Sequence, residues 1–68
     1  MGASKGLSSP MEILQAALKK EEAARRFYDE LANNTHVEAV RGLVAVLRDE
    51  EHRHVKLIQD KIVELRLG

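Results

Sequence analysis

Apolar residues follow the spacing of one α-helical face along two stretches of the chain. Within each stretch they recur mainly at steps of three and four residues. The first stretch contains Leu14, Ala17, Ala24, Tyr28 and Leu31. The second stretch contains Val37, Val40, Val44, Leu47, Ile58 and Leu65. The pattern predicts two helices, over about residues 10–32 and 36–67.

The ends of these stretches carry residues that helix ends favour. Ser9 can cap the first helix, Pro10 suits its first position, and Glu12 completes a capping box. Thr35 and Glu38 offer a second capping box at the start of the second helix. A connection this short predicts antiparallel neighbours. We therefore expect an all-α fold in which residues 9–68 form one helical hairpin.

Two parts of the chain depart from this pattern. Residues 1–8 are rich in Gly, Ser and Lys, and we predict that they form a flexible N-terminal segment. Gly42 lies inside the second predicted helix, where it is about 1 kcal/mol less favourable than Ala. We interpret Gly42 as a position of close packing.

The size and composition of the chain limit the ways in which such a hairpin can be stable. A single hydrophobic core is marginal in a chain of 68 residues. Proteins this small usually gain stability from disulfides, a metal or a partner chain. The chain has no cysteine, which excludes disulfides and thiolate metal sites. Metal binding and oligomerisation remain.

Charge and the length of apolar runs argue against nucleic acid and membranes as partners. Lys and Arg together number 11, as do Asp and Glu, so the net charge is zero and no basic field exists to bind nucleic acid. No apolar run approaches the length that spans a membrane. No signal peptide is evident at the N-terminus either. We therefore predict a cytoplasmic protein with neither nucleic acid nor membrane as a partner.

Three chemically active residues occupy positions inside the apolar stripes. Glu21 fills a missing step in the first stripe, and Glu51 and His54 fill missing steps in the second. The helical wheel therefore places two carboxylates and one imidazole on faces that should be buried. A buried charge is normally paired or bound to a metal. A carboxylate together with a neutral imidazole suits iron or manganese.

Simpler interpretations of the same residues exist. Glu21 could pair with Arg25, four residues later on the same helix. His54 could be an ordinary core histidine whose hydrogen bonds are satisfied. Asp49 and His52 form a second acid-x-x-His pair, which the wheel places on the solvent face.

One hairpin supplies too few ligands for a two-metal site. Two copies together supply four glutamates and two histidines from these positions. Di-iron carboxylate bundles use that set: a Glu from each of two helices, and Glu-x-x-His from each of the other two. A second copy would also cover the apolar stripe that two helices leave open. The alternative is a metal-free helical dimerisation module.

The motifs around these residues resemble those of the rubrerythrin branch of the ferritin-like superfamily. Residues 21–32 are similar to the family's first-helix pattern, Glu-x-x-Ala-x-x-Phe-Tyr-x-x-Leu-Ala. Residues 50–58 are similar to its pattern Glu-Glu-x-x-His-x-x-x-(Leu/Ile). The resemblance covers roughly residues 12–65. It implies that Glu21, Glu51 and His54 bind metal, with Glu51 bridging, and that Tyr28 lies near the metals.

The resemblance also implies an architecture and a chemistry. We expect the hairpin to form a homodimer, or a higher homo-oligomer, that completes a ferritin-like four-helix bundle with two iron ions per dimer; manganese is the alternative metal. The expected reaction is oxidation of ferrous iron by dioxygen or peroxide, as in a ferroxidase or a rubrerythrin-like peroxidase. The family usually has four helices in one chain, and this chain has two. It also lacks the cysteine-rich electron-transfer domain, so a peroxidase would need an external electron donor.

Overall fold

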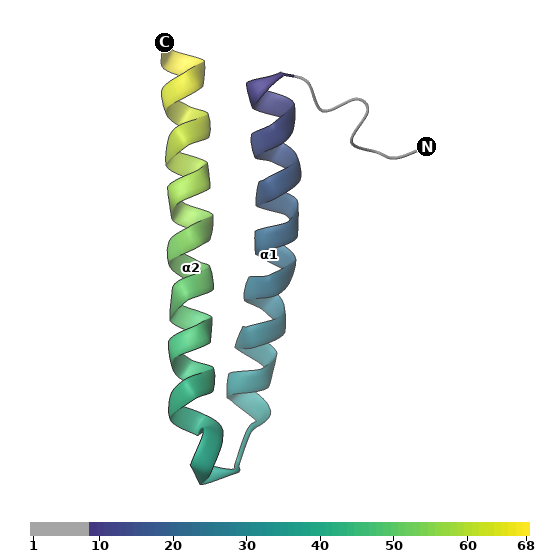
Figure 1. Ribbon diagram of the computed structural model, residues 1–68, viewed down its shortest axis with the longest axis vertical. Helices are drawn as coiled ribbons and strands as arrows, with labels where there is room; N and C mark the ends of the chain where they lie inside the picture. The colour runs from purple at the N-terminus through teal and green to yellow at the C-terminus, as the bar shows by residue number, and fades with distance from the viewer. Residues whose placement is uncertain (1–8) are drawn as a thin grey trace, which may run out of the picture.

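Two antiparallel helices lie side by side in the computed structural model, which describes residues 9–68 (Figure 1). Helix α1 spans Pro10–Asn34 and helix α2 spans Glu38–Leu67, with a short connection between them. The predicted all-α hairpin is confirmed. The N-terminal segment 1–8, predicted to be flexible, lies outside the described residues. Within them, neither helix is long and apolar enough to cross a membrane.

Helix α1 begins with the predicted capping box. The Ser9 hydroxyl oxygen accepts a hydrogen bond from the Glu12 N–H at 3.1 Å. The Glu12 carboxylate accepts one in return from the Ser9 N–H at 3.2 Å. Pro10 occupies the first helical turn, where its missing N–H has no intrahelical partner to lose. A cap of this kind typically stabilises a helix by about 1 kcal/mol.

The connection between the helices differs from the prediction. Helix α1 continues through Asn34 and has Thr35 as its C-cap, and the Thr35 hydroxyl donates to the Leu31 carbonyl. Helix α2 has Val37 as its N-cap, with no side-chain capping bond. The second predicted capping box, Thr35 with Glu38, is therefore wrong. The physical reason is that the Thr35 hydroxyl satisfies a carbonyl at the end of α1 and is not available to α2.

The seam between the helices is packed by a narrower set of residues than the stripes suggested. The buried core of the described residues is Val44, Val55 and Ile62, all on α2. Val55 and Ile62 were not members of the predicted stripe. Val40 and Leu65, which were, remain 42% and 41% exposed. The face that contacts α1 is therefore rotated away from the centre of the stripe.

Large apolar side chains of both helices remain exposed outside the seam. We call one set of them, which recurs at helical spacing, the open face; it comprises Ile13, Phe27, Leu31, Val40, Leu43, Leu57 and Leu65. Exposed apolar side chains in this number on a small protein favour an interaction surface.

Gly42 is exposed and lies inside α2. A Cβ placed on it would meet nothing within 4 Å. The interpretation of Gly42 as a close-packing position is therefore wrong within the hairpin, because no neighbouring element approaches its Cα.

Candidate metal centre

The three residues singled out by the sequence converge in the middle of the hairpin. Glu21 comes from α1, whereas Glu51 and His54 lie one turn apart on α2. Each offers one ligand atom, and these atoms all lie within 4.8 Å of one another. The i,i+3 spacing on α2 stacks the carboxyl and the imidazole on one side of the helix, next to Glu21.

The polar atoms of this cluster are close together but not satisfied. His54 Nδ1 lies 3.4 Å from Glu21 Oε1 and 3.6 Å from Glu51 Oε1. These distances exceed the roughly 2.7–2.9 Å of a good charge-assisted hydrogen bond. Both Oε1 atoms are buried and have no hydrogen-bond partner. A cation between the two oxygens and the imidazole nitrogen would satisfy all three, so the donor set fits iron or manganese.

The two carboxyl groups influence each other's protonation. The adjacent Glu51 carboxyl lowers the pKa of Glu21, and His54 lowers it further against the opposing effect of burial. The adjacent Glu21 carboxyl raises the pKa of Glu51, as does its burial. Two ionised carboxylates this close repel each other and have no donor between them. The metal-free pair thus favours a shared proton, which a bound cation would displace.

The cluster is closed on one side and open on the other. The side chains of Glu21 and Glu51 are 28% and 19% exposed, because the partner helix covers most of each. The His54 side chain is 45% exposed, and it lies on the edge of α2 next to the open face. Two carboxyls and one imidazole also fall short of the donors that two metal ions need. The cluster by itself therefore lacks the donors of a two-metal site.

Comparison with known proteins identifies the family. The family model for rubrerythrin matches residues 12–68, which is most of the chain and includes all three clustered residues. The chain belongs to the rubrerythrin family. No curated protein and no solved structure matches it. Membership agrees with the ferritin-like resemblance of the motifs, and iron is the metal that rubrerythrin-family proteins typically bind.

Tyr28 of this rubrerythrin-family chain is half-buried and lies seven residues after Glu21. Its ring packs edge-on against Phe27, with the ring centroids 5.0 Å apart and the planes at 76°. This contact gives Tyr28 a packing role in α1. Its predicted place beside the metals stays a prediction.

The simpler interpretation of Glu21 as a partner of Arg25 finds no contact to support it. Among the described residues, the ion pairs of Glu21 include His54 but not Arg25. Arg25 instead has a buried Nε atom without a hydrogen-bond partner. Glu21 is thus directed to the cluster on α2 rather than to its own helix.

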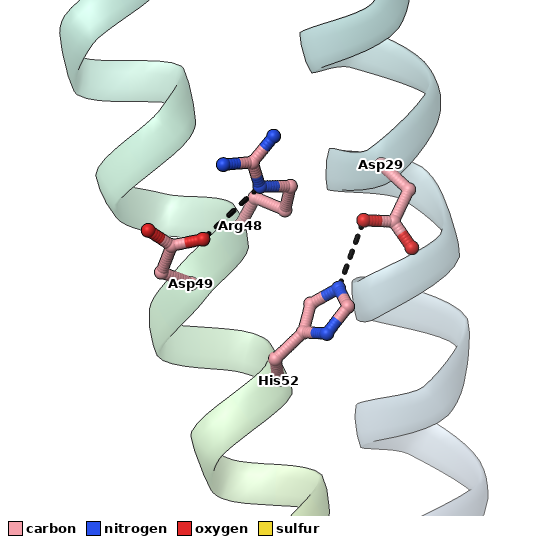
Figure 2. Close-up of polar contacts among 4 residues, drawn as sticks. All are labelled: Asp29, Arg48, Asp49 and His52. Carbon is pink, nitrogen blue, oxygen red and sulfur yellow. Dashed lines mark hydrogen bonds and ion pairs between the residues drawn. The ribbon is translucent and has the colours of Figure 1, made fainter.

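The second acid-x-x-His pair is divided between two different contacts (Figure 2). His52 Nε2 lies 2.9 Å from Asp29 Oδ1, across the seam between the helices. Asp49 instead contacts its neighbour Arg48, at 3.1 Å from Oδ1 to Nε. Asp49 and His52 therefore do not act together as ligands.

The bridge between Asp29 and His52 was missed by the sequence analysis. The sequence carries no signal for it. Glu21, Arg25 and Asp29 step by four along α1, and charges at that spacing are usual on a solvent-exposed helix face.

Proposed function

We propose that this chain is a di-iron carboxylate protein that oxidises ferrous iron with dioxygen or peroxide. Two copies associate through their open faces into a four-helix bundle, and Glu21, Glu51 and His54 of each copy bind two iron ions between them. The observation that carries the proposal is the pair of buried glutamate oxygens without partners beside the His54 imidazole. Membership of the rubrerythrin family supports iron as the metal.

Each residue has a defined task in this proposal. Glu51 releases the proton that it shares with Glu21, and both carboxylates then face the cation as anions. Neutral His54 offers Nδ1, the ring nitrogen that is nearest to both carboxylates. These three residues would hold iron, which would supply the electrons that reduce dioxygen or peroxide. Val55, which follows His54 and is buried in the seam, restricts water on that side of the cluster.

The partner copy is proposed for two independent reasons. Three buried residues are a small core for a chain of this size, and the open face leaves further apolar area in contact with water. The cluster itself supplies only half of a two-metal ligand set. Larger assemblies of such dimers, an external electron donor for a peroxidase reaction and a cytoplasmic location remain parts of the proposal.

Metal analysis of two matched histidine variants tests the site. His54→Ala and His52→Ala remove the same side chain from the same helix, but only the first lies in the cluster. Protein from iron-supplemented cells should contain about one iron per chain in the wild type and in His52→Ala, and little in His54→Ala. Ferrous oxidation rates should follow the iron content. Equal loss of iron in the two variants would exclude the cluster as the site.

A metal-free dimerisation module is the second candidate, and the open face alone favours it. The same experiment decides between the two. A wild-type dimer that contains no metal and acquires none from added ferrous ion under anaerobic conditions would support the module and exclude the iron centre.

A further inference from the structure

The first turns of helix α2, next to the connection between the helices, are weakly anchored to the rest of the hairpin (Figure 1). Residues 36–43 are all exposed, and Val44 is the first buried residue that follows them. Three large apolar residues among them, Val37, Val40 and Leu43, are 61%, 42% and 60% exposed. We call residues 36–43 the loop-side segment. Tertiary packing supplies most of the stability of a helix in a protein, and this segment has little of it.

Local interactions do not compensate for this lack of packing. The N-cap of α2 is Val37, which makes no side-chain capping bond, and the nearby Thr35 hydroxyl is bonded to the end of α1 instead. The backbone N–H of Val40 donates to the Val37 carbonyl at 3.1 Å and closes the first turn. The ion pair between Glu38 and Arg41 is 3.5 Å long, with side chains 89% and 60% exposed. Surface pairs of this kind contribute little to stability.

A glycine lies near the inner end of the loop-side segment. Gly42 is two residues before Val44, the first buried position of α2. Gly is a poor helix former, because it loses the most backbone freedom on folding. A Cβ at this position would meet nothing within 4 Å, so no close approach inside the hairpin requires Gly. The glycine therefore lowers the stability of the helix at the point where packing begins.

The start of α1 has the opposite properties. Ser9 and Glu12 form a reciprocal capping box, and Met11 and Leu14 in the first two turns are already half-buried. The two helices of one hairpin thus begin with different local stabilities. Proteins open locally in cooperative units, and a unit with few buried contacts and exposed backbone hydrogen bonds opens at the lowest free energy.

We propose that the loop-side segment is a separate folding unit, which unwinds while the rest of the hairpin stays folded and becomes helical when a second copy covers Val40 and Leu43. Both residues belong to the open face, so the inference rests on the association in the proposed function. The free energy needed to order the segment is then part of the free energy of association, as for other segments that fold on binding. Val44 and Glu51 lie beyond the segment, so the seam and the cluster keep their structure when it unwinds.

Hydrogen exchange measured at several protein concentrations tests the proposal, with sedimentation equilibrium to define the oligomeric state. Chelator is present throughout, so that metal binding does not contribute. At concentrations that favour the dimer, the amides of residues 42–46 should exchange as slowly as those of residues 55–62. After dilution to the monomer, residues 42–46 should exchange at rates close to those of an unfolded peptide, whereas residues 55–62 should stay protected.

Two stabilising variants act on the segment by independent routes. Gly42→Ala raises its helix propensity, and Val37→Asp supplies the missing cap. Each should slow exchange of residues 42–46 in the monomer and leave residues 55–62 unchanged. Each should also tighten dimerisation by about five-fold per chain, because less of the segment remains to be ordered on association.

A matched pair of alanines provides the control. Ala39→Gly and Ala23→Gly make the same change at exposed helical positions, the first inside the loop-side segment and the second in the middle of α1. Ala39→Gly should weaken dimerisation and leave exchange of residues 55–62 in the monomer unchanged. Ala23→Gly should speed exchange of residues 55–62, because it destabilises the helix against which they pack.

Three exchange patterns would overturn the proposal. Simultaneous loss of protection in both regions on dilution would show that the hairpin opens as one unit. Slow exchange of residues 42–46 in the monomer would show that the segment needs no partner, and fast exchange there in the dimer would show that the partner does not order it. None of these patterns bears on the iron site. A dimer that shows the expected pattern and binds no iron would instead overturn the proposed function alone.

Discussion

Two contacts between an imidazole and a carboxylate lie close together in the hairpin, and they differ in how far their polar atoms are satisfied. His52 and Asp29 form a direct bridge of 2.9 Å with side chains 50% and 37% exposed. His54 stands between two glutamates at longer distances, and an oxygen of each glutamate is buried without a partner. An imidazole and a carboxylate thus form a direct surface bridge in one place. In the other place, the carboxylates keep buried oxygens without hydrogen-bond partners.

The difference arises from where each histidine lies around α2. His52 is on the flank towards α1, where a single partner carboxylate completes its contact. His54 is on the edge of the open face, where α1 supplies one carboxylate and leaves the other side uncovered. Burial without partners is costly. A cluster kept in that state in so small a protein is better explained by a bound ligand than by its contribution to folding.

Removing a carboxylate from the cluster should give the largest effect. Ferrous ion that binds only the folded dimer should stabilise the wild type by about 2.7 kcal/mol at a concentration about 100-fold above Kd. Glu51→Leu should abolish this gain, yet stabilise the metal-free protein, because an apolar side chain replaces an unsatisfied acid. Anaerobic thermal unfolding with and without metal measures both effects.

The neighbouring glutamate provides the control for that experiment. Glu50→Leu removes an exposed carboxylate one residue away and should leave the metal-dependent stabilisation in place. If Glu51→Leu destabilised both forms equally and metal shifted neither midpoint, Glu51 would be an ordinary structural acid.

The pH dependence of the metal-free protein should be the next largest effect. The pKa of Glu51 is raised above its usual 4.5 by the adjacent Glu21 carboxyl and by burial. The folded state therefore holds a proton that the unfolded state has lost, and stability should fall as pH rises from 4.5 through the raised value. The pKa of Glu21 is lowered, so its contribution should be lost as pH falls below 4.5.

Substitution of the raised group isolates its effect. Urea unfolding in chelator should show that Glu51→Gln removes the decline above pH 4.5, because Gln does not titrate. An unchanged decline in Glu51→Gln would mean that the pH dependence arises elsewhere in the protein.

The sequence predicted the cluster better than it predicted the seam. Glu21, Glu51 and His54 stood out because each interrupts an apolar stripe, and a polar residue in such a position requires an explanation. Val55 and Ile62 were missed because apolar residues occupy a broad arc of α2. Periodicity does not reveal which part of that arc α1 covers and which part it leaves exposed.

The misjudged cap at Thr35 has a similar origin. Its hydroxyl suits both the end of one helix and the start of the next, and the choice depends on where the first helix stops. The role of a side chain could be predicted from the sequence where a single helix determined its surroundings. It could not be predicted for Thr35, because the ends of two helices compete for its hydroxyl.

A substitution at Gly42, remote from both histidine–carboxylate contacts, should stabilise the protein and leave the two contacts unchanged. Gly42→Ala adds a methyl group that meets nothing within 4 Å and reduces the entropy lost on forming α2. It should raise the free energy of unfolding by about 1 kcal/mol, equally with and without metal. Destabilisation would indicate that another chain packs against Gly42 in the assembled protein.

Cutting the bridge between His52 and Asp29 should have the smallest effect. Both side chains are partly exposed, and surface bridges contribute about 0.2–1 kcal/mol. A double-mutant cycle of His52→Ala and Asp29→Ala, followed by urea unfolding, gives the coupling energy. We expect the coupling to fall within that range and the iron content to stay at the wild-type level in all variants. A coupling well above 1 kcal/mol would assign the bridge a larger part in holding the helices together. Iron loss in Asp29→Ala would instead connect the bridge to the cluster and remove the distinction between the two contacts.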